Sequence, residues 1–170
     1  MKTTAVMLGA VLAVASCAVA AQPYPYQNEL SLFGSWDKVD EPIEIEVTNV
    51  QLRYGRFLSP QIVGTAALSR TRFESNASDD VTTSLTIGAK YYFGTLRSAA
   101  LVPFVDGAIG IANTDSGGND STDLTWEVGG GIAYFITDTT SIDAAIRLYQ
   151  TSTDAETEGT RLFVGLTTRF

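Results

Sequence analysis

The chain contains no histidine and only one cysteine, Cys17, among its 170 residues. Without histidine, nucleophilic catalysis through a Ser–His or Cys–His pair is excluded. Because Cys17 lies in the apolar N-terminal segment, the rest of the chain has no thiol for a disulfide, a zinc cluster or redox chemistry. We therefore expect no catalytic residues, no metal site and no cofactor.

Basic residues are also scarce, with 11 Lys and Arg against 19 Asp and Glu, for a formal net charge of −8. Such an acidic chain is a poor electrostatic partner for nucleic acid, so we expect no nucleic-acid binding. Long apolar runs are missing beyond residue 20, which excludes a membrane protein built from spanning helices.

Residues 1–20 have the pattern of a secretory signal peptide. Lys2 precedes an apolar stretch over residues 5–15, and Ala18-Val19-Ala20 forms a small-residue cleavage site before Ala21. Val14-Ala15-Ser16-Cys17 also fits a lipobox, which would instead leave Cys17 as a lipidated N-terminus. The interpretation that residues 1–20 are simply removed is favoured, with residues 21–27 as a short periplasmic segment.

The remaining residues alternate between apolar and polar side chains with period two, which predicts β-strands. The last ten residues show the pattern most plainly. Residues 162, 164, 166, 168 and 170 form one face, and the more polar face consists of residues 161, 163, 165, 167 and 169. We expect eight such strands, all of membrane-spanning length. They are placed at about residues 28–36, 47–55, 61–72, 82–93, 101–112, 124–136, 141–150 and 161–170.

The connections between these segments are predicted to alternate in length. Short links at 56–60, 94–100 and 137–140 alternate along the chain with longer polar loops at 37–46, 73–80, 113–123 and 151–159. The longer loops carry most of the 19 acidic residues, among them Asp40, Glu44, Asp80, Asp120 and Glu156. Short periplasmic turns, long external loops and an even strand number are the layout of a transmembrane β-barrel.

Aromatic residues give an independent indication of a membrane. On the apolar face they gather at the strand ends, where amphipathic rings favour the headgroup level of a bilayer. One predicted belt comprises Tyr54, Tyr91, Phe93, Tyr134 and Phe170, and a sparser belt at the opposite end comprises Trp36 and Trp126. A general preference of tyrosine for strands would not predict this clustering.

The opposite, inward face carries four acidic and five basic residues: Glu29, Arg53, Lys90, Asp106, Glu127, Asp143, Arg147, Arg161 and Arg169. Side chains just fill the interior of an eight-stranded barrel, so these charges are predicted to pair and plug it. A symmetric turn places Lys90 opposite Asp106, while Glu127 and Arg147 are diagonal neighbours. Glu29 and Arg169 are expected to meet where the first and last strands close the barrel.

Two surface features are candidates for binding. Arg70 and Arg72 fall on the outward face of the third segment near its external rim, where lipopolysaccharide phosphates would lie. An equally good interpretation pairs them with acidic loops. The segment 113–123 is rich in oxygen ligands for calcium but lacks the EF-hand spacing, and a solvated loop is favoured.

Over residues 28–170, the strand pattern, the belts and the terminal Phe170 together resemble the superfamily of eight-stranded outer-membrane β-barrels. This superfamily includes OmpX-like and OmpW-like proteins and the OmpA transmembrane domain. The resemblance implies an all-β, antiparallel, up-and-down barrel in the outer membrane of a Gram-negative bacterium. It also implies that the barrel assembly machinery reads the C-terminal strand ending in Phe170.

We therefore expect a non-enzymatic, monomeric outer-membrane protein that supports envelope integrity or surface interaction through acidic external loops. Its expected partners are outer-membrane lipids and lipopolysaccharide. One alternative is a small transporter or narrow pore for hydrophobic or small polar solutes. Another is a soluble or lipid-anchored binding barrel of lipocalin type, with the same alternation turned inside out.

Overall fold

The computed structural model describes residues 26–39, 45–75, 79–96, 100–116, 119–152 and 157–170. The predictions of a signal peptide or a lipobox at Cys17 lie outside these residues. Within the described ranges, no helix is long and apolar enough to cross a membrane.

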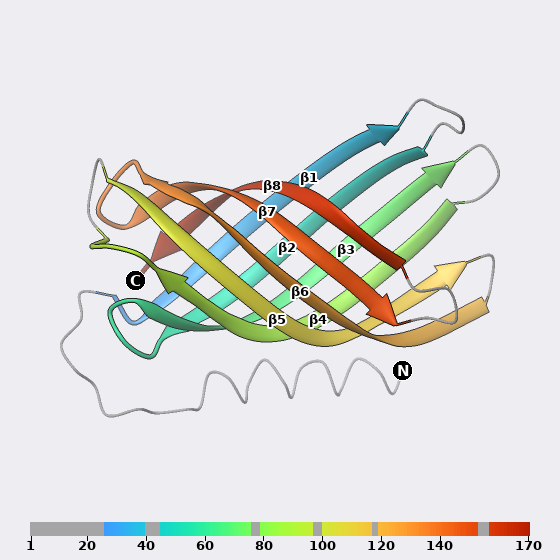
Figure 1. The fold of residues 1–170 in the computed structure, drawn as a ribbon, viewed down its shortest axis with the longest axis horizontal. Coiled ribbons are helices and arrows are strands. Elements are labelled where there is room, and N and C mark those ends of the chain that lie inside the picture. The colour runs from blue at the N-terminus through green and yellow to red at the C-terminus, as the bar shows by residue number, and fades with distance from the viewer. Residues whose placement is uncertain (1–25, 40–44, 76–78, 97–99, 117–118, 153–156) are drawn as a thin grey trace.

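Eight antiparallel strands form a closed barrel in chain order, as predicted (Figure 1). Their bounds are β1 Asn28–Val39, β2 Ile45–Phe57, β3 Ile62–Ser75, β4 Asp79–Tyr92, β5 Leu101–Ser116, β6 Asn119–Phe135, β7 Thr140–Ser152 and β8 Thr157–Arg169. The start of β1 and the C-terminus lie at one end of the barrel (Figure 1). We call this the terminal end. The opposite end, where β1 connects to β2, β3 to β4, β5 to β6 and β7 to β8, is called the hairpin end.

Alternation along each strand separates an apolar outer face from a polar inner one. On β7, Ile142, Ile146 and Leu148 are about half exposed, whereas Asp143 and Arg147 between them are almost fully buried. A strand turns successive side chains to opposite faces, so this pattern puts the charges inside. The alternative of a lipocalin-type barrel with an apolar interior and a water-facing outside is therefore wrong.

The strands extend further toward the hairpin end than the sequence predicted. The segment 113–123, expected to be a loop, continues β5 and β6, with Asn113 opposite Thr122 and Asp115 opposite Asp120. Similarly, Glu74 on β3 lies opposite Asp79 on β4. Polar residues signal a position outside the bilayer, but they do not prevent the backbone from continuing its ladder. The predicted contrast between short turns and long loops is therefore wrong.

The contact between β1 and β8, which closes the barrel, is shorter than the other ladders. β1 pairs with β2 over its whole length, but with β8 only from Glu29–Arg169 to Gly34–Val164. Beyond Gly34 the two strands diverge toward the hairpin end (Figure 1). At the terminal end, Phe170 secures the closure, because its amide donates to Asn28 O at 3.0 Å and its carbonyl accepts from Asn28 N at 2.9 Å.

Candidate functional site

The barrel lumen holds the buried polar residues and is the candidate functional site. Its side chains form three groups, of which the first two pack against each other in the terminal half and the third lines the hairpin half. The first is an apolar cap of Val63, Tyr92, Val102, Phe104, Ala133 and Phe135, all at most 2% exposed. The second is an ionic layer, and the third is a cavity lined largely by hydroxyl groups.

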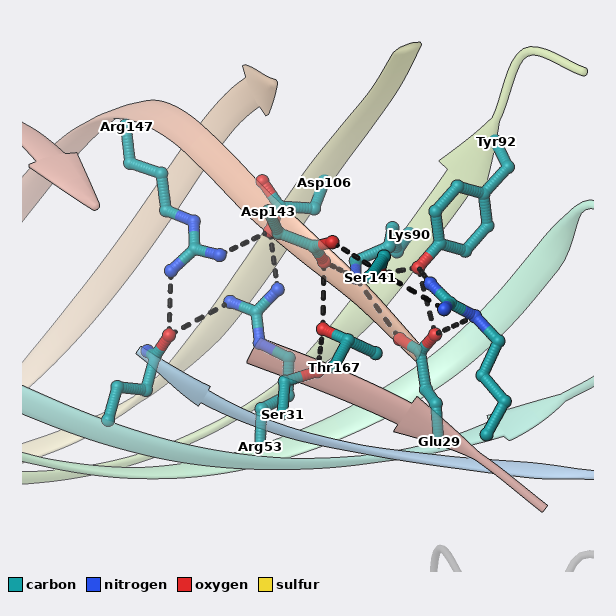
Figure 2. A network of polar contacts seen from close by, with 12 residues as sticks. Glu29, Ser31, Arg53, Lys90, Tyr92, Asp106, Ser141, Asp143, Arg147 and Thr167 are labelled. Carbon is teal, nitrogen blue, oxygen red and sulfur yellow. Dashed lines mark hydrogen bonds and ion pairs between the residues drawn. The ribbon is translucent and has the colours of Figure 1, made fainter. Parts of the chain in front are cut away.

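In the half of the ionic layer nearer the terminal end, Lys90 lies between two carboxylates. Its Nζ is 3.2 Å from Glu29 Oε1 and 3.6 Å from Asp143 Oδ2, and none of the three side chains is exposed. These residues come from β4, β1 and β7, so the group spans the lumen (Figure 2). Neutralisation of each charge by its neighbours offsets the large cost of removing them from water.

Tyr92 connects this group to Arg169. Its hydroxyl donates to Glu29 Oε2 at 2.8 Å and accepts from Lys90 Nζ at 2.9 Å and from Arg169 Nη2 at 2.8 Å. Arg169 also donates to Ser141 Oγ at 3.1 Å, and Ser141 donates to Asp143 Oδ1 at 2.6 Å. The polar groups thus form a continuous ring across the barrel, with Tyr92 as a shared partner.

The half of the ionic layer nearer the middle of the barrel contains two arginines and two carboxylates. Arg53 bonds Asp106 Oδ2 through Nη1 and lies 2.9 Å from Glu127 Oε1 through Nη2. Arg147 Nη2 is 2.9 Å from the same Asp106 oxygen, and Nη1 donates to Gln51 Oε1 at 2.6 Å. Figure 2 shows both guanidinium groups in contact with Asp106.

Aromatic rings on the inner face pack against the same cations. The Arg147 guanidinium lies 4.7 Å from the centroid of Phe163 and 5.0 Å from that of Phe33. Lys90 Nζ lies 4.8 Å from the centroid of Phe104. Ring faces carry negative potential, so they stabilise buried cations that carboxylates alone only partly surround. Rings and ion pairs together fill this part of the lumen.

The predicted pairings hold only in part. Glu29 and Arg169 meet, with Arg169 Nε 3.6 Å from Glu29 Oε2. Lys90 does stand opposite Asp106 in the ladder, but it binds Glu29 and Asp143 instead. A lysine long enough to reach across the lumen finds two carboxylates there, while Asp106 is taken by Arg53 and Arg147.

The prediction that diagonal neighbours Glu127 and Arg147 pair is also corrected, because Glu127 bonds Arg53 and Arg147 bonds Asp106. Arg161 departs further from the predicted charge network. Among the described residues it makes no ion pair, and its guanidinium instead lies 4.5 Å from the centroid of Tyr149. On β8 it is the direct ladder partner of Arg147, and its side chain lines the cavity of the hairpin half.

Most of the predicted surface residues lie on the outer face. The belt side chains of Phe93, Tyr134, Trp126 and Phe170 are exposed, and Tyr54 and Tyr91 are partly exposed. Trp36 lies on β1, but its side chain is outside the part of the chain that the structure describes. Arg70 and Arg72 are exposed on β3, opposite Val50 and Thr48 of β2.

Sequence reasoning missed Tyr92, Gln51 and the inward aromatic residues. Tyr92 lies between Tyr91 and Phe93, whose membrane-belt positions dominate the pattern of that segment. The same period-two phase that turns Lys90 inward also turns Tyr92 inward, so the signal was present. Phe33 and Phe163 likewise share the inward phase with Ser31 and Arg161.

A closed antiparallel barrel with an apolar outer face, aromatic residues at its rims and a polar interior is a transmembrane β-barrel. The sequence matches the family model described as outer membrane protein beta-barrel domain over residues 4–170. The chain belongs to this family and is an integral protein of the outer membrane.

Several solved outer-membrane barrels share the fold. The chain is 19% identical to the N-terminal β-barrel domain of Pseudomonas aeruginosa OprF, with a TM-score of 0.58, covering 85% of this chain and 98% of that one. With Neisserial surface protein A the sequence identity is 17% and the TM-score is 0.62, and the match covers 85% of this chain and 97% of that one. With the outer membrane enzyme PagL the sequence identity is 17% and the TM-score is 0.53, and the match covers 81% of this chain and 97% of that one. No curated protein matches the sequence.

Proposed function

We propose that the protein is a non-conducting, non-enzymatic outer-membrane barrel of a Gram-negative bacterium. In this role it supports envelope integrity or surface interaction. The observation that carries the proposal is the closed lumen. Lys90, Glu29 and Asp143 have no exposed side-chain surface, and the fully buried Tyr92 and Phe135 lie in the apolar cap beside them. The close packing of these charges and rings supports a lumen without a continuous aqueous path for a solute.

The acidic hairpin end supports a role at the surface. Asp115 is the ladder partner of Asp120 in the β5–β6 hairpin, and Glu74 is the ladder partner of Asp79 in the β3–β4 hairpin. Both termini of an even-stranded barrel lie at one end, which we assign to the periplasm, so these hairpins project outward. A negative rim would favour basic or cation-bridged partners.

Planar-bilayer recording tests the proposal directly. The refolded barrel should leave the bilayer without single-channel steps over a range of voltages, and an empty-detergent addition is the control. The second candidate is a narrow pore, favoured by the open cavity that occupies the hairpin half of the lumen. Reproducible conductance steps would establish that candidate and end the proposal of a closed lumen.

We further propose that Arg70 and Arg72 contact lipopolysaccharide phosphates. Both side chains are exposed on the outer face of β3, beyond the last apolar residue on that face, Leu68. The variant Arg70→Gln with Arg72→Gln should lose most of the thermal stabilisation that lipopolysaccharide gives the wild type, with unchanged stability in phosphatidylcholine. Equal stabilisation of both forms by lipopolysaccharide would contradict the assignment.

The remaining expected partner is the assembly machinery, which we propose engages β8. This proposal is supported by Phe170, whose exposed side chain ends the apolar outer face formed by Val164 and Leu166. We also propose a monomer. The likeness to PagL is one of fold, and the absence of histidine from this chain supports a role without Ser–His catalysis.

A further inference from the structure

The hairpin half of the lumen contains a cavity of about 320 Å³. Gln51 and Glu127 of the ionic layer form its floor, and Phe73, Asp80 and Ser121 mark its rim. Ligand-binding pockets commonly begin at about 300 Å³, so the space is adequate for a small ring-shaped molecule. We call this cavity the cup.

Ten of the eighteen residues that line the cup carry a hydroxyl group. Several of these hydroxyls are arranged in cross-strand pairs: Ser69 with Ser84 at 2.6 Å, Thr82 with Thr114 at 2.9 Å, and Thr125 with Thr151 at 3.3 Å. Each hydroxyl can donate once and accept twice, so a pair that shares one bond retains further capacity. Such a wall suits a neutral ligand with several hydroxyl groups better than an ion or an acyl chain.

Asn49 supplies a buried acceptor that has no partner. Its Nδ2 donates to Thr71 Oγ1 at 2.6 Å, but its Oδ1 has no hydrogen bond from any described residue, although Asn49 is only 2% exposed. A buried acceptor of this kind is stabilised only when a donor reaches it. Both Asn49 and Thr71 line the cup, so that donor would come from its contents.

Arg161 supplies the complementary donors on the same side of the cup. Its Nη1 reaches Thr71 Oγ1 at 3.4 Å, so Thr71 is shared between Asn49 and Arg161. The guanidinium is held over the Tyr149 ring at 4.5 Å, which fixes its plane while leaving most of its N–H groups available. A vicinal diol can donate to Asn49 Oδ1 and accept from Arg161 at the same time.

We infer that the cup binds one ring of a neutral saccharide or cyclic polyol that enters from the hairpin end. The hydroxyl pairs contact the ring's outer hydroxyls, and Asn49, Thr71 and Arg161 fix one diol. The ligand is either a free monosaccharide or the terminal residue of a longer glycan. This inference is independent of whether the lumen conducts.

The test is NMR titration of the isotope-labelled barrel in a zwitterionic detergent without a sugar headgroup. The probes are glucose, galactose, mannose and myo-inositol. At least one probe should cause saturable changes in the amide chemical shifts of Asn49, Thr71 and Thr125, while the amide chemical shifts of the apolar cap stay unchanged. Absence of saturable shifts for all probes would show that the cup holds only solvent and would overturn the inference.

Two variants locate the binding. Arg161→Met should weaken it at least tenfold, whereas the control Arg56→Met, which removes an arginine from the outer face of β2, should leave it unchanged. Ala112→Phe fills the cup without removing any hydrogen bond involving a described side chain, so it should abolish binding in a barrel that still folds. Undiminished binding in both Arg161→Met and Ala112→Phe would overturn the inference.

The source of the ring is decided by comparing a free sugar with the same sugar at the end of an oligosaccharide. Tighter binding of the oligosaccharide assigns the cup to a glycan end. Equal binding assigns it to the free sugar. Either result supports the saccharide ring as the ligand.

Discussion

At the scale of single residues, each buried charge has more than one partner. Lys90 contacts two carboxylates, a tyrosine hydroxyl and two rings, and Asp106 lies between two arginines. Removing one member of such a group leaves the others buried and uncompensated, which costs more than the interaction itself contributes. The energetic importance of these residues therefore lies in their mutual dependence.

Replacing Lys90 with methionine should lower the free energy of unfolding by about 3–5 kcal/mol, because Glu29 and Asp143 remain charged and buried. Urea unfolding in phosphatidylcholine vesicles, followed by tryptophan fluorescence, measures the change. Arg70→Met is the matched control, and as an exposed substitution it should alter stability by about 0.5 kcal/mol or less.

The double variant Lys90→Met with Asp143→Asn should recover part of that loss, since Asp143 loses its ion-pair partner Lys90, whereas Glu29 keeps Arg169 at 3.6 Å. If the single variant unfolds as easily as the Arg70 control, the contacts around Lys90 contribute little, and the reasoning about buried pairs fails here.

At the scale of strands, inward glycines let neighbouring backbones and long side chains approach. A Cβ added to Gly131 of β6 would lie 2.1 Å from Ala144 O and 2.8 Å from Phe104 Cζ. Gly107 of β5 lies on the outer face, and there the nearest atom to an added Cβ, Glu127 O, is 3.6 Å away. The two glycines differ in surroundings, so the same substitution should have different effects.

We expect Gly131→Ala to destabilise the barrel by about 1–3 kcal/mol, because backbone atoms would have to move. Gly107→Ala should be tolerated. The folded fraction can be read from SDS gels run without boiling, since closed barrels migrate differently until heated. Equal folded fractions for both variants would contradict the steric argument.

At the scale of the whole molecule, two kinds of side chain fill the terminal half of the lumen, and we propose that together they close it. The apolar cap repels water, and the ionic layer fills the space with paired charges. Phe104→Ala combined with Phe135→Ala should therefore open the cap without producing conductance in planar bilayers, because the ionic layer still spans the barrel. Ion steps in this variant would identify the cap as the sole seal.

The sequence was sufficient for the strand number, the phase of each strand and the inward position of the charges. Alternation determines these features locally, as at Asp143 and Arg147 of β7. It could not identify the partners of Lys90, because ladder register places only the Cα atoms and a long side chain selects its partners across the lumen. Nor could it separate hairpin from loop at 113–123, where polarity reports solvent exposure and not backbone pairing.

The ladder between β1 and β8 stops at Gly34 and Val164, and this short pairing should affect how lipids pack beside the two strands. Past Gly34 and Val164, β1 and β8 are no longer paired with each other. Hydrocarbon cannot satisfy peptide groups, so acyl chains should not rise above that level on this side of the barrel. We therefore expect the outer leaflet to be locally thinned beside β1 and β8, giving an otherwise cylindrical protein one side that lipids pack against less well.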